Sequence, residues 1–103
     1  MSTSAKLVQR SAHERVVDVL QDGREFSIVF RRVSDNWEGH PIEVDINLRV
    51  SERSLSKGGA SNGGALRALA DYYAERAVEA PELGLPALDF DALTKALHTT
   101  GVL

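Results

Sequence analysis

The sequence predicts an α+β domain of two layers, in which a small antiparallel sheet is covered on one face by two C-terminal helices. Two observations carry this prediction. The first half of the chain contains segments that alternate apolar and polar residues, and the second half spaces its apolar residues as helices do. With 103 residues, we expect one domain over 11–103, after a flexible segment over 1–10 and with a glycine-rich connection at 56–64. About three strands in a meander would form the sheet.

The segment that follows residue 10 supports two interpretations. Ser11 and Glu14 have the spacing of a helix capping box. Against a helix, the valines that follow are β-branched, and Asp22-Gly23 is a strong two-residue hairpin signal. We favour a strand over 15–21 that pairs with the next strand. The helical alternative would leave a sheet of only two strands, which is marginal by itself.

Two strands follow with clear alternation. In the segment 24–33, Phe26, Ile28 and Phe30 share one face. A turn-forming stretch separates it from the segment 42–51, whose apolar face holds Ile42, Val44, Ile46, Leu48 and Val50. A strand that is apolar on one side only belongs to an antiparallel sheet with one solvated face.

The second half predicts two helices. The first spans 65–80, and its buried stripe would be Leu66, Leu69, Ala70, Tyr73, Ala77 and Ala80. Pro81 ends it. Asp89 can cap a second helix over 90–98, which faces the core with Phe90, Leu93, Ala96 and Leu97, before a tail over 99–103.

Composition excludes several classes of protein. The absence of cysteine excludes disulfides, thiol redox chemistry and cysteine-ligated metals. A formal charge of −3 argues against general affinity for nucleic acid or an anionic membrane. Lacking a long apolar run, the chain is expected to be cytoplasmic, and its preference for Arg and Ala is typical of bacteria. Residues 1–57 are neutral overall, so the net negative charge lies in residues 58–103.

The glycine-rich stretch suggests one alternative function. Residues 57–64 lead into a helix N-terminus, where backbone N–H groups favour anions such as the phosphates of nucleotides or acyl-CoA. However, Lys57 precedes the glycines, whereas a phosphate-binding loop places its lysine after them. The βαβ unit of a dinucleotide fold is also missing. A flexible linker is therefore the favoured interpretation, with no cofactor.

Two local resemblances concern the same region. The stretch 62–71 resembles the helix of hot-dog thioesterases, and the strand, glycine stretch and helix together resemble the acyl-CoA-binding element of N-acetyltransferases. The first resemblance implies that Asp71 is catalytic and that Asn62 lies near the thioester. Either fold needs further strands beyond this helix, and the residues after Ala80 are predicted to be helical. We therefore predict that the protein is not an enzyme.

A second alternative is nucleic-acid binding through one end of the sheet, at Arg31, Arg49 and Arg53. Aromatic residues for base stacking do not accompany these arginines, and acidic residues share their face. Cross-strand pairing between arginine and glutamate is the simpler explanation. The histidines have no metal-ligand spacing, so we expect no metal site.

The leading hypothesis is a non-enzymatic protein–protein interaction module, such as an adaptor, an immunity or antitoxin protein, or a phage-type inhibitor of a host complex. Trp37 lies in a polar loop, where it is either an interface hot spot or a lid on the core. A homodimer could form through the edge of the strand 24–33 or 42–51. The predicted partner-binding residues are Trp37, Tyr72, Asp71, Glu75, Glu79 and Glu82.

Overall fold

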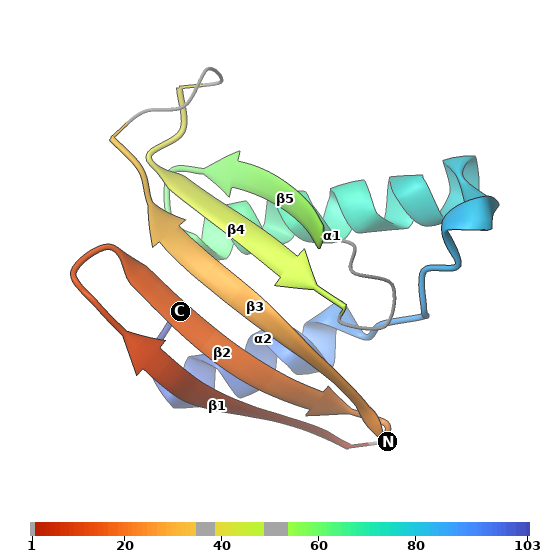
Figure 1. Cartoon of the computed structure of the whole chain (residues 1–103), viewed down its shortest axis with the longest axis horizontal. Coiled ribbons are helices and arrows are strands. Elements are labelled where there is room, and N and C mark those ends of the chain that lie inside the picture. Colours follow the sequence, from red (N-terminus) through yellow and green to blue (C-terminus); the bar gives the residue numbers. More distant parts are fainter. Residues whose placement is uncertain (1, 35–38, 49–53) are drawn as a thin grey trace.

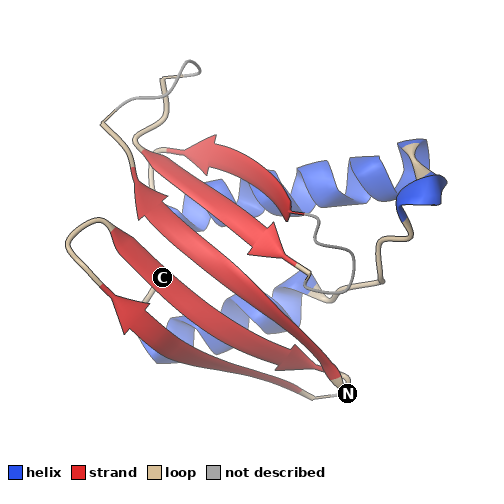
Figure 2. Ribbon diagram, in the orientation of Figure 1, coloured by secondary structure: helices blue, strands red, loops and turns tan. Residues whose placement is uncertain are grey.

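The computed structural model describes residues 2–34, 39–48 and 54–103, which form a five-stranded antiparallel sheet with two helices on one face (Figures 1 and 2). The strands follow one another in the order β1-β2-β3-β4-β5. Their bounds are β1 Thr3–Arg10, β2 Glu14–Gln21, β3 Arg24–Arg32, β4 Ile42–Asn47 and β5 Ser54–Gly59. The helices are α1 Asn62–Glu79, a short 3-10 helix η1 Pro81–Leu83, and α2 Phe90–Thr100. The predicted α+β class is confirmed, with five strands rather than three.

The first additional strand lies where a flexible segment was expected. Residues 3–10 form β1, which pairs with β2 along its length. Ala5 and Leu7 pack against the core, and the alternating residues of β1 are exposed. The expectation of flexibility over 1–10 was therefore wrong for these eight residues. Their apolar side chains are too few to form a strand alone, and pairing with β2 supplies the missing stabilisation.

The second additional strand lies in the predicted glycine-rich connection. Ser54–Gly59 form β5, so the connection to α1 is only Ala60 and Ser61. A Cβ on Gly59 would lie 2.5 Å from the backbone nitrogen of Ala65, which is closer than real Cβ atoms approach. The linker interpretation was therefore wrong, since Gly59 allows the strand to pack directly against the start of the helix.

The hairpin between β2 and β3 confirms the favoured interpretation of residues 11–23. Asp22 and Gly23 both have positive φ, 51° and 81°, as a tight two-residue hairpin turn requires. Since β3 and β4 each have neighbours on both sides, neither offers a free edge. The proposed pairing of these two strands across a twofold axis was therefore wrong, because the edges of the sheet are β1 and β5.

The core lies between the sheet and the helices. It contains the predicted apolar residues of β3 and, from the predicted strand 42–51, Ile42, Val44, Ile46 and Leu48, together with residues from β2, α1 and α2. β4 ends at Asn47, and Val50 lies outside the described residues. α1 begins earlier than predicted, with Ser61 as its cap: the Ser61 hydroxyl accepts a hydrogen bond from the Gly64 amide at 3.1 Å. Of the predicted stripe, Ala77 is exposed, and Ala65 is buried instead. α2 continues two residues beyond its predicted end at His98, and Val102 in the predicted tail is buried.

A single buried amide fixes the start of α2 to the sheet. Gln21 is only 3% exposed. Its side chain donates a hydrogen bond to the Asp89 carbonyl at 3.0 Å and accepts one from the Asp89 N–H at 2.9 Å. It also donates to the Thr3 hydroxyl at 2.9 Å. Asp89 in turn caps α2, since its carboxylate accepts from the Ala92 N–H at 3.0 Å. The Gln21 side chain therefore ties the first turn of α2 to the sheet, in addition to the apolar packing of α2.

The two helices cover different parts of the sheet. α1 packs on β4 and β5, whereas α2 packs on β1. In Figure 1 both helices lie behind the sheet and are separated from one another. Because they pack on opposite ends of the sheet, their facing sides are left to line a groove.

Candidate functional site

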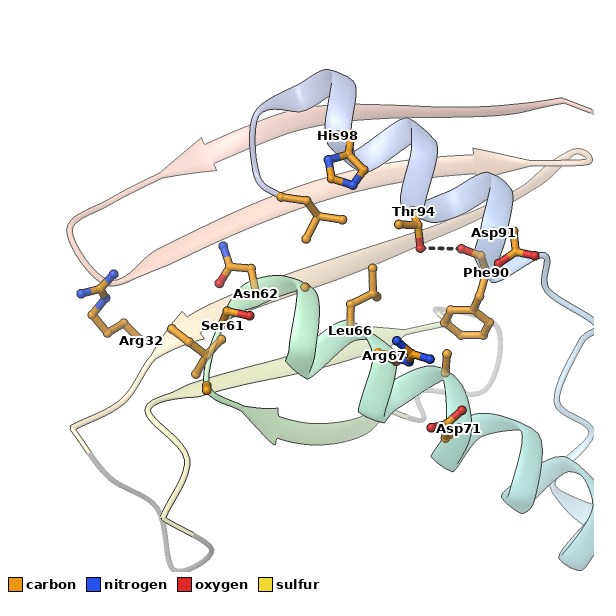
Figure 3. A pocket seen from close by; sticks show the side chains of 15 residues that line it. Arg32, Ser61, Asn62, Leu66, Arg67, Asp71, Phe90, Asp91, Thr94 and His98 are labelled. Atoms are coloured by element: carbon orange, nitrogen blue, oxygen red, sulfur yellow. Dashed lines mark hydrogen bonds between the residues drawn. The ribbon is translucent and has the colours of Figure 1, made fainter.

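The main candidate site is the interhelical groove, an open depression of about 850 Å³ between α1, α2 and the adjoining ends of β3 and β4 (Figure 3). Its floor is apolar and consists of buried or half-buried side chains: Ile42, Leu66, Ala70, Phe90 and Leu103. Its rim carries exposed charged or titratable side chains: Arg32, Arg67, Asp71, Asp91 and His98. An apolar floor with a polar rim is the arrangement found at protein interfaces and ligand sites.

Helical spacing places these residues on the facing sides of the two helices. On α1, Leu66 and Ala70 are four residues apart, and each is followed by a charged residue. On α2, the lining residues Phe90, Thr94 and His98 also repeat every four residues. Each helix therefore presents both apolar floor residues and polar rim residues to the groove.

Both ends of the groove are held by tertiary contacts. At one end the Phe90 ring meets the Tyr73 ring edge-on, with their centroids 5.4 Å apart. The Tyr73 hydroxyl donates a hydrogen bond to the Pro86 carbonyl, and burial raises the pKa of Tyr73 to about 12. At the other end the Asn62 amide donates to the Val102 carbonyl at 2.8 Å. These contacts fix the shape of the groove before anything binds.

The charged side chains of the rim have no partners within the described part of the chain. Arg32, Arg67, Asp71, Asp91 and His98 form no side-chain hydrogen bond or ion pair there. Figure 3 places Arg32 at one end of the groove, and Asp71 and Asp91 at the other. Unpaired charges beside an apolar floor are available to a bound molecule.

On the outer face of the sheet, which carries no helix, a cluster of charged side chains is paired. There Arg31 forms ion pairs with Glu14, Glu43 and Asp45 at 3.2, 3.1 and 2.9 Å. The hydrogen bond to Asp45 raises the pKa of Arg31, and Glu14 adds to this effect. The predicted cross-strand pairing is confirmed here, and Arg31 is engaged by its neighbours. Arg49 and Arg53, the other residues of the predicted nucleic-acid site, lie outside the described residues.

The structure separates the predicted partner-binding residues. Asp71 lines the groove, and Glu75 and Glu79 follow it at successive turns of α1, with Glu82 beyond them in η1; all four are exposed. Glu79 lies 4.0 Å from the Arg76 guanidinium. Tyr72 is half-buried instead, and the Lys57 ammonium of β5 lies 4.9 Å from its ring centroid. Trp37 lies outside the described residues.

Several rim residues were not identified from the sequence. Arg32, Arg67, Asp91 and His98 were not among the predicted partner-binding residues. The available signal was strand alternation, which places Arg32 on the helix side of β3 and Arg31 on the outer side. His98 joins the groove, but within residues 2–34, 39–48 and 54–103 no cluster of three His, Asp or Glu side chains is suited to a metal ion.

The folds suggested by the local resemblances do not match this architecture. The hot-dog and acetyltransferase folds place strands after the helix that corresponds to α1, whereas only η1 and α2 follow α1. None of the helices in the described ranges combines the length and hydrophobicity of a membrane crossing. No protein-family model matches the chain, and neither a curated protein nor a solved structure shows significant similarity to it.

Proposed function

We propose that this chain is a non-enzymatic interaction module that binds a segment of a partner protein in the interhelical groove. The proposal rests on a contrast between the outer face of the sheet and the side of the molecule that carries the groove. On the outer sheet face, Arg31 is held in ion pairs with three carboxylates, whereas the charged side chains of the groove rim have no partners among the described residues. Partner recognition requires such free groups beside apolar surface.

The shape of the groove favours a peptide segment as its occupant. Two helices flank an open apolar floor, as in proteins that accept an amphipathic segment between helices. The floor would supply affinity through burial of apolar area, and the rim charges would supply specificity. Glu75 and Glu79 continue from Asp71 along the exposed side of α1, Glu82 follows in η1, and all three belong to the proposed surface. We keep the prediction that the protein acts in the cytoplasm as an adaptor, an immunity or antitoxin protein, or an inhibitor. We also keep the prediction of a homodimer, now without the interface through β3 or β4.

A random peptide library displayed on phage tests the proposal without knowledge of the partner. The full chain is immobilised, and enriched peptides are titrated into labelled protein while backbone amide signals are followed by NMR. We expect the largest shifts at residues of the groove, such as Leu66, Ala70 and Phe90.

A matched pair of variants controls this experiment. Ala70→Gln places a longer polar side chain on the floor, whereas Ala74→Gln makes the same change on an exposed part of α1 outside the groove. Binding should weaken about tenfold or more for Ala70→Gln and stay within about twofold for Ala74→Gln. No enrichment of peptides, or equal effects of the two variants, would overturn the proposal. A rise in melting temperature with nucleotides or coenzyme A alone would favour the ligand-binding alternative instead.

A further inference from the structure

The groove differs in charge between its two ends, and this difference identifies the chemistry of the occupant. We infer that the bound segment presents apolar side chains to the floor, basic side chains to the end formed by Asp71 and Asp91, and an acidic side chain to the end formed by Arg32. The inference rests on the proposed function, because it describes the partner of the same groove.

The acidic end draws on both helices. Asp71 projects from α1 and Asp91 from the first turn of α2, and both are exposed with no partner among the described side chains. Arg67 lies one turn before Asp71 but forms no ion pair with it within 4.0 Å. Glu75 extends the negative charge one turn further along α1. Two carboxylates against one guanidinium leave this end negative.

The basic end is defined by one side chain. Arg32 is the last residue of β3 and is exposed, and strand alternation assigns it to the helix side of the sheet; Figure 3 shows it at one end of the groove. The first turn of α1 and the last turn of α2 meet near this end, so their opposed helix dipoles offset one another and Arg32 supplies its charge. The neighbouring lining residues at this end carry no acidic side chain: Ile42, Ala60, Ser61, Asn62 and Gly63. An acidic group of the partner is the complement of this end.

Exchanging the charges at each end tests the inference. A peptide selected with the wild-type chain should bind Asp71→Lys/Asp91→Lys about tenfold or more weakly, and replacing its Lys or Arg by Glu should restore binding. For Arg32→Glu, replacement of the peptide's acidic residue by Lys should restore binding. The substituted residues are exposed, so the fold should persist. Because Asp91 lies in the first turn of α2, Asp91→Lys should lower the melting temperature by a few degrees, which thermal unfolding by circular dichroism measures.

Control variants carry the same charge changes elsewhere. Glu25→Lys and Arg10→Glu alter exposed residues of β3 and β1 that do not line the groove, and binding should stay within about twofold. One outcome would overturn the inference while the proposed function stands. In that outcome, peptides bind in the groove and Ala70→Gln weakens their binding, but the charge-reversal variants do not weaken it or the complementary peptide does not restore it. If no peptide occupies the groove, the proposed function fails and the inference fails with it.

Discussion

At the scale of single residues, Gln21 joins two parts of the chain that are far apart in sequence. Its amide is buried and satisfies both backbone groups of Asp89, 68 positions later. A buried backbone group that loses its partner costs about 1–3 kcal/mol. Fold and groove both depend on this contact, because it holds the first turn of α2.

Removing the Gln21 amide should therefore destabilise the protein strongly. We expect Gln21→Ala to lower the free energy of unfolding by about 2–4 kcal/mol, since two backbone groups of Asp89 lose their partner. Gln9→Ala is the control, because Gln9 is exposed on β1, and it should change stability by less than about 0.5 kcal/mol. Urea unfolding measures both. Similar losses for the two variants would show that the amide does not position α2.

Tyr73 should make stability depend on pH in the alkaline range. Burial raises its pKa from 10.0 to about 12 in the folded state, so the folded protein holds the phenol proton more tightly than the unfolded chain does. This contribution is complete below pH 10 and is lost as the pH rises towards 12, with an upper bound of about 2–3 kcal/mol.

The test compares wild type with Tyr73→Phe by urea unfolding at pH 9 and pH 11.5. Tyr73→Phe should lose about 1 kcal/mol at pH 9, because the Pro86 carbonyl loses its hydrogen bond. Its further loss towards pH 11.5 should be smaller than that of wild type, since it lacks the titrating group. Parallel curves for the two proteins would contradict the assigned role of burial.

At the scale of secondary-structure elements, the junction of β5 and α1 contains two glycines with different roles. Gly59 is required by the close packing, whereas Gly63 is replaceable. Gly59→Ala should cost about 2 kcal/mol or more, because its Cβ would overlap the backbone of Ala65. Gly63 lies in the first turn of α1 with open space around its Cα, so Gly63→Ala should be neutral or stabilise by up to about 1 kcal/mol. Thermal and urea unfolding measure both, and equal effects would refute the close approach.

The same scale shows what local sequence predicts and what it does not. Alternation located β3 and β4, and Asp22-Gly23 located the hairpin, because these signals depend on neighbouring residues alone. β1 and β5 escaped prediction, since the Ser, Lys and Gly residues that they contain have low strand propensity and pairing with a neighbour decides their conformation. Among the described residues of the predicted partner-binding set, only Asp71 lines the groove. The rest of the groove depends on where α2 packs on the sheet. That position depends on contacts between distant residues, such as Gln21 with Asp89, which local sequence patterns do not reveal.

At the scale of the whole molecule, the two sides of the sheet differ in how their charges are used. On the outer face one guanidinium links three carboxylates from β2 and β4. This arrangement connects three adjacent strands in a solvated setting, where each pair contributes little but a network contributes more. Around the groove, by contrast, the charged side chains of the rim have no partners among the described residues.

Removing the central guanidinium tests this division. Arg31→Met should lower stability by about 1 kcal/mol at low salt, because Glu14, Glu43 and Asp45 are left to repel one another. The loss should shrink in 1 M NaCl, and peptide binding should not change. Urea unfolding at two salt concentrations, with the groove variant Arg32→Glu as comparison, measures the effect. A loss of peptide binding with intact stability would place the binding surface on the sheet instead.

The contact between Gln21 and Asp89 also determines when the groove can form during folding. One wall of the groove, α1, packs on β4 and β5, the two strands that precede it in the chain. The other wall, α2, packs on β1 and is hydrogen-bonded to Gln21 of β2, so its contacts lie near the opposite end of the sequence. Contacts between residues so far apart require closure of a long loop and tend to form late. A chain whose last helix has not yet docked therefore has a complete sheet but only one wall of its binding groove. The groove is therefore complete only after the two ends of the chain have come together.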